Sequence, residues 1–297
     1  MATKSESLSV VPAGTLMLGG ELQIHRLGFG CLHLTGQPGD WGPPKNIIEG
    51  QEVLRKAVQA GINFLDTADS YGPAVSENLI SETLYPYNQN IPHKSPKIVV
   101  ATKGGFKRPG PNEWIVDGRP EYLKRCVEES LKRLRLECID LYQLHQLDPN
   151  VDPADSLGAL KEMQDEGKIR FIGLSNVNIT EIQYCQKIVD IVSIQNLYNL
   201  SNRESEPVLK YCEEHALAFI PWFPLGSGGL LRSNKKLEKV AKEKGATPAQ
   251  IAIAWLLQKS PVMVPIPGTS SVKHLEENIK AASLTLSKEE FDLLSNE

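Results

Sequence analysis

The chain has 297 residues, of which 41% are hydrophobic and 23% are charged, and its formal net charge is −4. This composition is typical of a globular protein and gives no reason to expect binding to nucleic acid or to an anionic membrane. The sequence holds no apolar run near the ~18 residues that a membrane-spanning helix needs. Its length suits a single α/β barrel domain.

The N-terminal residues are polar and lack the apolar core of a signal peptide. We therefore expect residues 1–13 to form a flexible tail and residues 14–297 to form one domain. The five cysteines are odd in number, are widely spaced and include no Cys-x-x-Cys pair. This pattern argues against structural zinc, so no metal site is expected, and it favours a reducing, cytoplasmic compartment.

Residues 15–24 are predicted to form a small hairpin with Gly19 and Gly20 in its turn, followed by a first strand over residues 27–34. One unit then repeats along the chain: an amphipathic helix, a breaker and an apolar strand. The first unit has a helix ending at Gly61 and a strand ending at Asp66. The later elements are predicted, in chain order, at residues 76–84 (helix), 98–102 (strand), 123–134 (helix), 139–144 (strand), 155–166 (helix), 170–174 (strand), 180–188 (helix), 191–195 (strand), 205–215 (helix), 217–223 (strand), 247–257 (helix), 263–266 (strand), 272–281 (helix) and 288–295 (helix).

Eight predicted strands thus alternate with helices, and they are apolar on both faces, as in a parallel sheet that helices cover. Eight such units in about 270 residues indicate the α/β class and a single (β/α)8 TIM barrel with a short N-terminal β-hairpin. A doubly wound sheet is the alternative. Against it, the Gly-x-Gly-x-x-Gly turn that would open a helix after the first strand is missing.

Titratable side chains stand at the ends of three consecutive predicted strands. Asp66 ends the second strand and Tyr71 comes shortly after it, Lys103 follows the third strand, and His145 follows the fourth. Taken singly, each has an ordinary structural explanation, such as a turn cap, a half-buried ring or a surface charge. Because a barrel brings the C-terminal ends of its strands to one rim, the four together predict an active site.

These four groups suit proton transfer to a reducible oxygen. A phenol has a pKa near 10 and is a poor acid at neutral pH. An ammonium about 4 Å away contributes roughly 4 kcal/mol in favour of the phenolate, so Lys103 is expected to lower the pKa of Tyr71 toward the operating pH. Asp66 would pair with Lys103 and offset part of this effect. His145 would orient a carbonyl oxygen as a neutral donor.

The chain resembles the aldo-keto reductases over essentially its whole length. The motifs that carry the resemblance are jointly specific, and they lie at Gly61–Gly72, Ala101–Lys103, Leu141–His145, Gly173–Asn176, Ser193–Gln195, Ile266–Thr269 and Glu276–Asn278. The resemblance implies a barrel that binds NADP(H) in extended form without a Rossmann fold. It also implies that Tyr71 is the general acid, tuned by Lys103 and Asp66. His145 would then orient the substrate.

The same resemblance implies the cofactor contacts. Ser175, Asn176 and Gln195 would hydrogen-bond the nicotinamide carboxamide, and Trp222, which also suits a core position, would stack on the ring. The loop over residues 223–229 would pass over the pyrophosphate, although its composition equally suits a plain flexible turn. The expected cofactor-contacting residues are Gly30, Cys31, Leu32, Asp66, Ser175, Asn176, Gln195, Trp222, Phe223, Pro224, Leu225, Gly226, Ser227, Gly268, Thr269, Ser270, Lys273, His274, Glu277 and Asn278.

The adenine end departs from the best-known branch of the family, in which a lysine and an arginine hold the 2′-phosphate. The matching positions here are Gly268 and His274, with Ser270 and Lys273 nearby. Hydroxyl groups, a helix N-terminus and one lysine can still hold a phosphate, though less tightly than two permanent cations. We therefore expect NADPH as the cofactor, with NADH use not excluded.

Apolar side chains in the predicted loops suggest the substrate class. Leu32, Trp41, Phe106 and Trp114 can form a wall suited to a flat or aromatic aldehyde, although the two tryptophans could instead pin their own loops. The loop at residues 41–44, with the nearby Asp-Ser-Tyr-Gly-Pro run, resembles a bacterial branch that includes pyridoxal reductases. A pyridine aldehyde is therefore the first candidate substrate.

Two other functions fit parts of the sequence. Lys103, at a barrel strand end, could form a Schiff base as in an aldolase-type enzyme. The fold also serves as a non-catalytic, NADPH-binding regulatory subunit of channels, although this chain has no long insertion to supply a partner surface. The expected partner is a small carbonyl compound, and the expected state is a monomer or a weak homo-oligomer.

Overall fold

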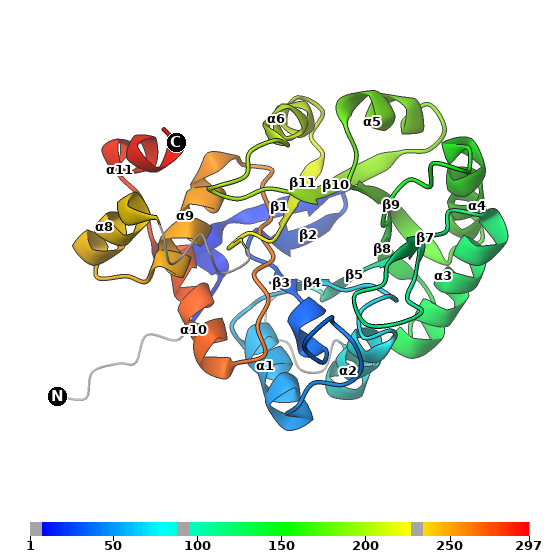
Figure 1. Cartoon of the computed structure of the whole chain (residues 1–297), viewed down its shortest axis with the longest axis horizontal. Coiled ribbons are helices and arrows are strands. Elements are labelled where there is room, and N and C mark those ends of the chain that lie inside the picture. Colours follow the sequence, from blue (N-terminus) through cyan, green and yellow to red (C-terminus); the bar gives the residue numbers. More distant parts are fainter. Residues whose placement is uncertain (1–7, 88–95, 227–233, 297) are drawn as a thin grey trace.

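The computed structural model describes residues 8–87, 96–226 and 234–296. Within them, a strongly curved parallel sheet of seven strands forms the centre, and helices surround it (Figure 1). The strand order is β11-β10-β9-β8-β5-β4-β3, so the sheet follows the order of the chain. The strands are β3 (Phe29–Gly30), β4 (Phe64–Asp66), β5 (Val99–Gly104), β8 (Ile139–Leu144), β9 (Ile169–Ser175), β10 (Ile191–Leu197) and β11 (Ala218–Trp222).

A short irregular segment joins the two edges of this sheet. On one side, Phe219 of β11 donates its N–H to the carbonyl oxygen of Val262 at 2.9 Å and accepts from the N–H of Val264 at 2.8 Å. On the other side, the carbonyl oxygen of Pro265 accepts from the N–H of Gly28 at 3.0 Å. Because proline has no N–H, this segment cannot form a continuous ladder. The predicted barrel is confirmed, but its predicted eighth strand is a bridge instead of a regular strand.

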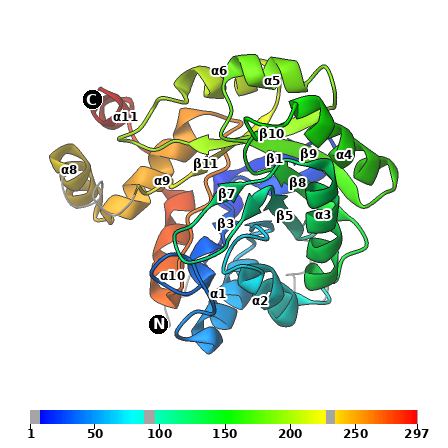
Figure 2. The same cartoon turned by 45° about the vertical axis from the view of Figure 1, so that its right-hand side comes forward.

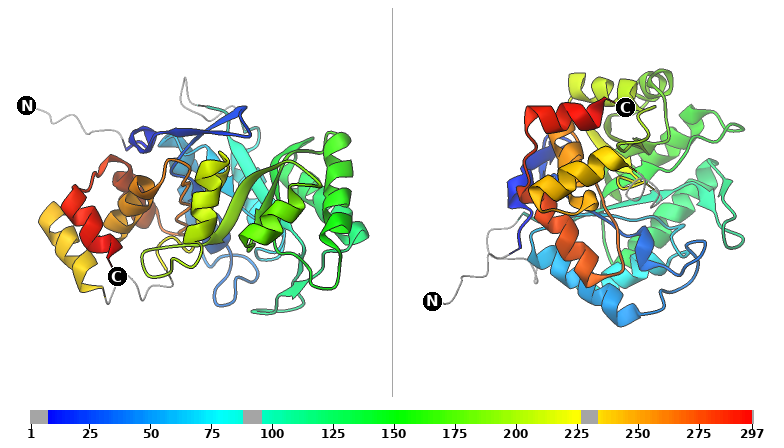
Figure 3. Two further views of the ribbon diagram at one scale, coloured as in Figure 1. Left: turned by 90° about the horizontal axis from the view of Figure 1, so that it is seen from above. Right: turned by 60° about the vertical axis from the view of Figure 1, so that its left-hand side comes forward.

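The predicted N-terminal hairpin is confirmed and closes one end of the barrel. It consists of β1 (Thr15–Leu18) and β2 (Leu22–His25), and the two glycines of its turn have φ values of 58° and 74°. Leu18 and Ile24 are buried against the residues that fill the barrel interior. In the left view of Figure 3 the hairpin lies at one end of the barrel and the long loops at the other. A site at the strand C-termini therefore lies away from the hairpin.

The packed structure begins before the boundary that the sequence suggests. Val10 is fully buried, and its N–H donates to the carbonyl oxygen of Ala60 at 3.0 Å. Val11–Ala13 then form a short 3-10 helix. Residues 10–13 therefore belong to the packed domain, and residues 1–7 of the expected tail lie outside the described residues.

The predicted first strand is also shorter than expected. Only Phe29–Gly30 pair with β4, and Leu32–Leu34 form a 3-10 helix at the end of the sheet. Gly30 lies so close to the closing segment that an added Cβ would be 2.6 Å from the carbonyl oxygen of Ile266. This close backbone contact holds the short strand in place.

The helices form where apolar residues recur at helical spacing. In α3 (Pro120–Leu134), Leu123, Val127 and Leu131 line the buried face, and the proline stands in the first turn, where its missing N–H is not needed. The other helices that cover the barrel are α1 (Ile47–Gln59), α2 (Val75–Leu84), α4 (Pro153–Asp165), α5 (Ile179–Cys185), α6 (Glu206–Glu214), α9 (Pro248–Lys259) and α10 (Val272–Lys280).

Two features of the structure were not predicted from the sequence. Helix α8 (Lys235–Lys244) lies beside α9 and α11 (Lys288–Ser295) and buries Leu237, Val240 and Ala241 (Figure 1). The long loop after β5 contains a small antiparallel hairpin of β6 (Phe106–Lys107) and β7 (Ile115–Val116), seen in Figure 2. Its two-residue strands are too short to give an alternating pattern.

Candidate active site

A buried ion pair lies at the C-terminal ends of β4 and β5. The Lys103 ammonium donates to the Asp66 carboxylate at 2.7 Å, to the carbonyl oxygen of Thr67 at 2.8 Å and to the hydroxyl of Tyr71 at 3.2 Å. The side chains of the ion pair are 0% and 2% exposed. The three donor positions of the ammonium are thus all used, and one of them is aimed at the phenol.

Two amides hold the other oxygen of Asp66. The side chains of Gln143 and Gln195 donate to its Oδ1 at 3.1 and 2.8 Å. Gln195 was predicted as a cofactor contact, whereas Gln143 has no assigned role in the sequence reasoning. A glutamine within the buried strand β8 is the signal that could have found it, because a buried amide needs partners.

The prediction that the pKa of Tyr71 is lowered is wrong, because the pKa is raised. Burial of the phenol raises its pKa above the ordinary value of 10.0, and the nearby Lys103 ammonium offsets only part of that effect. The reason is that Asp66 cancels much of the ammonium's charge, while desolvation of the phenolate remains. Tyr71 is therefore fully protonated at neutral pH.

The ammonium of Lys103 is kept charged. Burial by itself lowers the pKa of Lys103, but Asp66 and Tyr71 outweigh it, so the pKa is raised overall. Breaking this pair would leave a buried charge without a partner, which is costly in a protein interior.

His145 follows β8 and faces the same space as Tyr71. Burial and the charges of Lys103 and Arg108 hold the pKa of His145 well below its ordinary value, so the ring is neutral at pH 7, as the sequence reasoning expected. Its Nδ1 lies 3.5 Å from the Ser70 hydroxyl, and its ring centre lies 6.0 Å from that of Tyr71. The ring is therefore held beside the phenol.

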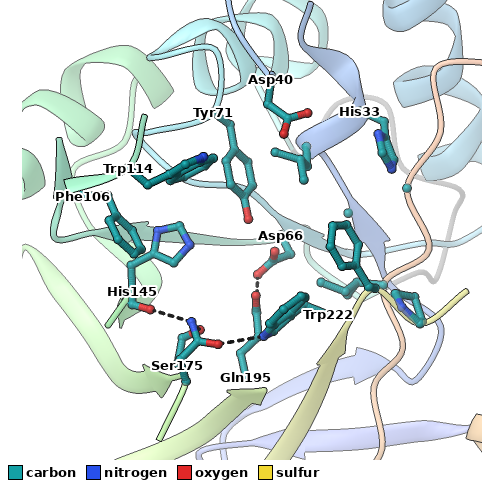
Figure 4. Close-up of a pocket in the computed structure, with 17 residues that line it drawn as sticks. His33, Asp40, Asp66, Tyr71, Phe106, Trp114, His145, Ser175, Gln195 and Trp222 are labelled. Carbon is teal, nitrogen blue, oxygen red and sulfur yellow. Dashed lines mark hydrogen bonds between the residues drawn. The ribbon is translucent and has the colours of Figure 1, made fainter. Parts of the chain in front are cut away.

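The residues expected at the nicotinamide ring lie together at the ends of β9, β10 and β11 (Figure 4). Asn176 donates to the backbone carbonyl of His145 at 3.1 Å and accepts from the indole N–H of Trp222 at 3.0 Å. Asn176 has a φ of 59°, a left-handed conformation that asparagine tolerates better than most residues. The hydroxyl oxygen of Ser175 accepts a hydrogen bond from the side-chain amide of Asn176 at 3.2 Å. These contacts orient the amide and the indole.

A cavity of about 350 Å³ opens between these groups. Its walls bring together most of the predicted groups at the strand ends, and they are Gly30, Leu32, His33, Asp40, Asp66, Tyr71, Phe106, Trp114, His145, Ser175, Asn176, Gln195, Trp222, Phe223, Pro224, Ile266 and Gly268. The sequence reasoning missed His33, Asp40 and Ile266 as wall residues. Trp41, expected in the apolar wall, is not among the lining residues and instead lies beside Arg108, 5.6 Å from ring centre to guanidinium.

Other expected cofactor contacts lie outside this cavity. Cys31 is fully buried and is not among the lining residues. Residues 269–271 precede α10, and residues 272–278 belong to it. The side chain of Lys273 in this helix is 81% exposed. Ser227 falls outside the described residues. The residues outside the cavity wall within the described part are Cys31, Leu225, Gly226, Thr269, Ser270, Lys273, His274, Glu277 and Asn278.

Arg108 connects three loops at the mouth of the cavity. Its guanidinium and Nε donate to the carbonyl oxygens of Gly39, Ser70 and Glu113 at 2.7, 2.8 and 3.0 Å. The guanidinium also stacks on Trp114, 3.7 Å from the ring centre. We refer to these contacts as the Arg108 clamp.

Among the described residues, no group of three or more His, Cys, Asp or Glu side chains is arranged to hold a metal ion. In the same part of the chain, no helix is both long enough and apolar enough to cross a membrane. The cavity wall presents the phenol of Tyr71, the imidazole of His145 and the carboxylate of Asp66, and the Lys103 ammonium lies directly behind them.

Comparison with known proteins identifies the family. Residues 26–296 match the model of the aldo/keto reductase family. The chain belongs to the aldo/keto reductase family. An uncharacterized oxidoreductase of Schizosaccharomyces pombe is 46% identical over 293 residues, which cover 99% of this chain and 92% of that protein. The pyridoxine 4-dehydrogenase of Escherichia coli is 40% identical over 276 residues, covering 91% of this chain and 93% of the relative.

Solved structures of aldo/keto reductases have the same fold. The structure of a thermostable aldo-keto reductase with the inhibitor epalrestat superimposes with a TM-score of 0.81 at 30% identity, covering 95% of this chain and 98% of the other. This aldo/keto reductase is therefore an NAD(P)H-dependent oxidoreductase, as the motifs of its sequence predicted. The family acts on small carbonyl compounds.

Proposed function

We propose that this aldo/keto reductase uses NADPH to reduce an aromatic or heteroaromatic aldehyde to the alcohol, with Tyr71 as general acid. The observation that carries the proposal is the contact of 3.2 Å between the Lys103 ammonium and the Tyr71 hydroxyl, at the wall of a cavity with aromatic sides. A pyridine aldehyde such as pyridoxal is the first candidate, supported by the 40% identity to pyridoxine 4-dehydrogenase.

In the proposed mechanism, Ser175, Asn176, Gln195 and Trp222 would hold the nicotinamide of NADPH, which would supply hydride for the carbonyl carbon. The neutral ring of His145 orients the carbonyl oxygen toward the phenol. Tyr71 donates its proton to that oxygen as negative charge develops there, and Lys103 stabilises the phenolate that remains. Asp66 keeps Lys103 charged and in place. The raised pKa of Tyr71 ensures that the proton is present at the start.

Three features of the described residues support the binding of an extended nicotinamide dinucleotide. Gly30 and Gly268 both line the cavity, and they approach so closely that a Cβ on Gly268 would lie 2.3 Å from the carbonyl oxygen of Gly30. Helix α10 begins without a side-chain cap on its backbone N–H groups, which are a favourable environment for a phosphate. Lys273 would add one cation for the 2′-phosphate. We therefore propose NADPH as the preferred cofactor, with weaker use of NADH.

The Schiff-base alternative is less well supported. A lysine that attacks a carbonyl must be neutral, whereas the pair with Asp66 raises the pKa of Lys103 and uses each of its N–H donors. A monomer or weak homo-oligomer and a cytoplasmic location stay predictions. The five free cysteines support the latter.

The test is a Tyr71→Phe variant assayed by loss of NADPH absorbance with a panel of aldehydes that includes pyridoxal. We expect turnover to fall by ~10²–10⁴, the usual contribution of a general acid, while NADPH affinity by fluorescence titration stays within about twofold. The control is Tyr184→Phe, which removes a hydroxyl from an exposed tyrosine outside the cavity. Near-normal turnover in Tyr71→Phe would refute the mechanism, and no turnover of any aldehyde by the wild type would refute the function.

A further inference from the structure

A carboxylate lines the cavity that the proposed mechanism does not use. Asp40 stands in the loop before α1, and Figure 4 shows it on the side of Tyr71 that is away from the phenol hydroxyl. Its backbone carbonyl accepts from the N–H of Gly72 at 3.1 Å, and Trp41 forms a parallel bridge with Gly72. Asp40 is therefore held in a fixed position relative to Tyr71.

The carboxylate of Asp40 retains capacity for a ligand. One oxygen accepts from the side-chain amide of Gln37, and within the described parts of the chain the other oxygen has no hydrogen bond and no ion pair. Asp40 has a φ of 50°, a left-handed conformation that aspartate and asparagine adopt more readily than most residues. An Asp40→Asn variant would keep both the shape and the backbone.

The other charged groups near the cavity are already occupied. Asp66 is neutralised by Lys103, and the imidazole of His145 is held neutral. The Arg108 clamp directs three of its five N–H groups to backbone carbonyls and presents its face to Trp114. Arg108 is not among the lining residues, so its charge weakens the field of Asp40 from outside the cavity wall. Among the lining residues, no ammonium or guanidinium is present, although His33 lies at the rim.

We propose that Asp40 sets the charge preference of the substrate site. It accepts a hydrogen bond from, or attracts, a donor or cationic group at the end of the aldehyde remote from the carbonyl, and it disfavours aldehydes that carry a carboxylate or a phosphate there. The inference rests on the proposed function, because it concerns the substrate of the same site. It assigns a specificity role to a residue that takes no part in proton or hydride transfer.

The test uses three aldehydes of one shape and different charge: 4-carboxybenzaldehyde, its neutral amide 4-carbamoylbenzaldehyde, and the cationic (4-formylphenyl)trimethylammonium ion. The kcat/KM of each with NADPH is measured for the wild type, for Asp40→Asn and for Glu113→Gln. The last variant removes the same charge from an exposed side chain outside the cavity wall. Intrinsic differences in reactivity cancel when the ratio of cationic to anionic substrate is compared between proteins.

We expect Asp40→Asn to lower the cationic-to-anionic ratio by about tenfold, the effect of removing one charge near a partly solvated ligand, and Glu113→Gln to leave it unchanged. An unchanged ratio in Asp40→Asn, with active protein and a normal melting temperature, would overturn the role of Asp40 and leave the reductase function intact. If the wild type reduces none of the three aldehydes, the proposed function itself fails. An equal fall of the ratio in Glu113→Gln would show a general charge effect and would also overturn the proposal.

Discussion

At the Tyr71 end of the proposed cofactor site, each polar atom of the Asp66 and Lys103 side chains has a partner, and both side chains are buried. At the α10 end, the Lys273 side chain is 81% exposed and lies 4.0 Å from Glu277. The first region has its geometry built into the folded protein. In the second, the cation is exposed to solvent and has one loose ion-pair contact. The comparison suggests that chemistry depends on preorganised contacts, and cofactor preference on a weaker and screened attraction.

The largest effect on stability and activity is expected from breaking the buried ion pair of Lys103 and Asp66. Lys103→Met leaves Asp66 charged and unpaired, which should cost ~3–5 kcal/mol of unfolding free energy and abolish reduction. Urea unfolding and NADPH absorbance assays measure the two effects. The double variant Lys103→Met, Asp66→Asn should recover most of the stability but none of the activity. If the double variant is as unstable as the single one, the uncompensated charge is not the cause.

Gln143 and Gln195 both donate to Asp66, and variants of the two can separate an effect on stability from an effect on cofactor binding. Gln143→Leu and Gln195→Leu each remove one hydrogen bond to a buried carboxylate, for an expected loss of about 1–3 kcal/mol in unfolding free energy. Only Gln195, at the cavity wall, should also weaken NADPH binding in a fluorescence titration. A similar loss of NADPH affinity in both variants would show that the amide acts through Asp66.

A smaller effect, on NADPH binding, is expected from Lys273 at the α10 end of the proposed cofactor site. Lys273→Ala should weaken NADPH binding by about threefold to tenfold, leave NADH binding unchanged, and lose most of its effect at high salt. Lys280→Ala, which removes an exposed cation from the far end of the same helix, is the matched control. Equal losses for both cofactors would place Lys273 away from the 2′-phosphate.

The smallest effect is expected on the melting temperature, from Asp69 near Tyr71. Burial and the nearby Glu77 raise the pKa of Asp69 from 3.8 to about 7, and its Oδ1 is buried without a hydrogen-bond partner. Because the folded state holds this proton more tightly than the unfolded state, Asp69 reduces stability progressively as the pH rises from about 4 to about 7. Asp69→Asn should therefore raise Tm at pH 8, on the order of 3 °C, and change it little at pH 4. An equal change at both pH values would contradict this.

The sequence predicted the barrel and the groups at its strand ends because both depend on local patterns. Apolar runs and breakers mark the strands, and Asp66, Lys103 and His145 each follow such a run. The sign of the Tyr71 pKa shift could not be predicted, because it depends on how burial and the ion pair balance in three dimensions. Asp40 was missed for a related reason: it precedes Trp41 in an irregular loop, and only the bridge to Gly72 brings it to the cavity.

The Arg108 clamp joins backbone carbonyls that come from three separate loops of the barrel. These loops are therefore mechanically coupled, and a change of length in one would displace the anchor of the other two. An engineer who exchanges a single loop with that of a relative should expect misplaced walls, whereas an exchange of all three together keeps their mutual fit. New substrate ranges should be easier to reach by changing side chains on the existing loops than by changing the loops themselves.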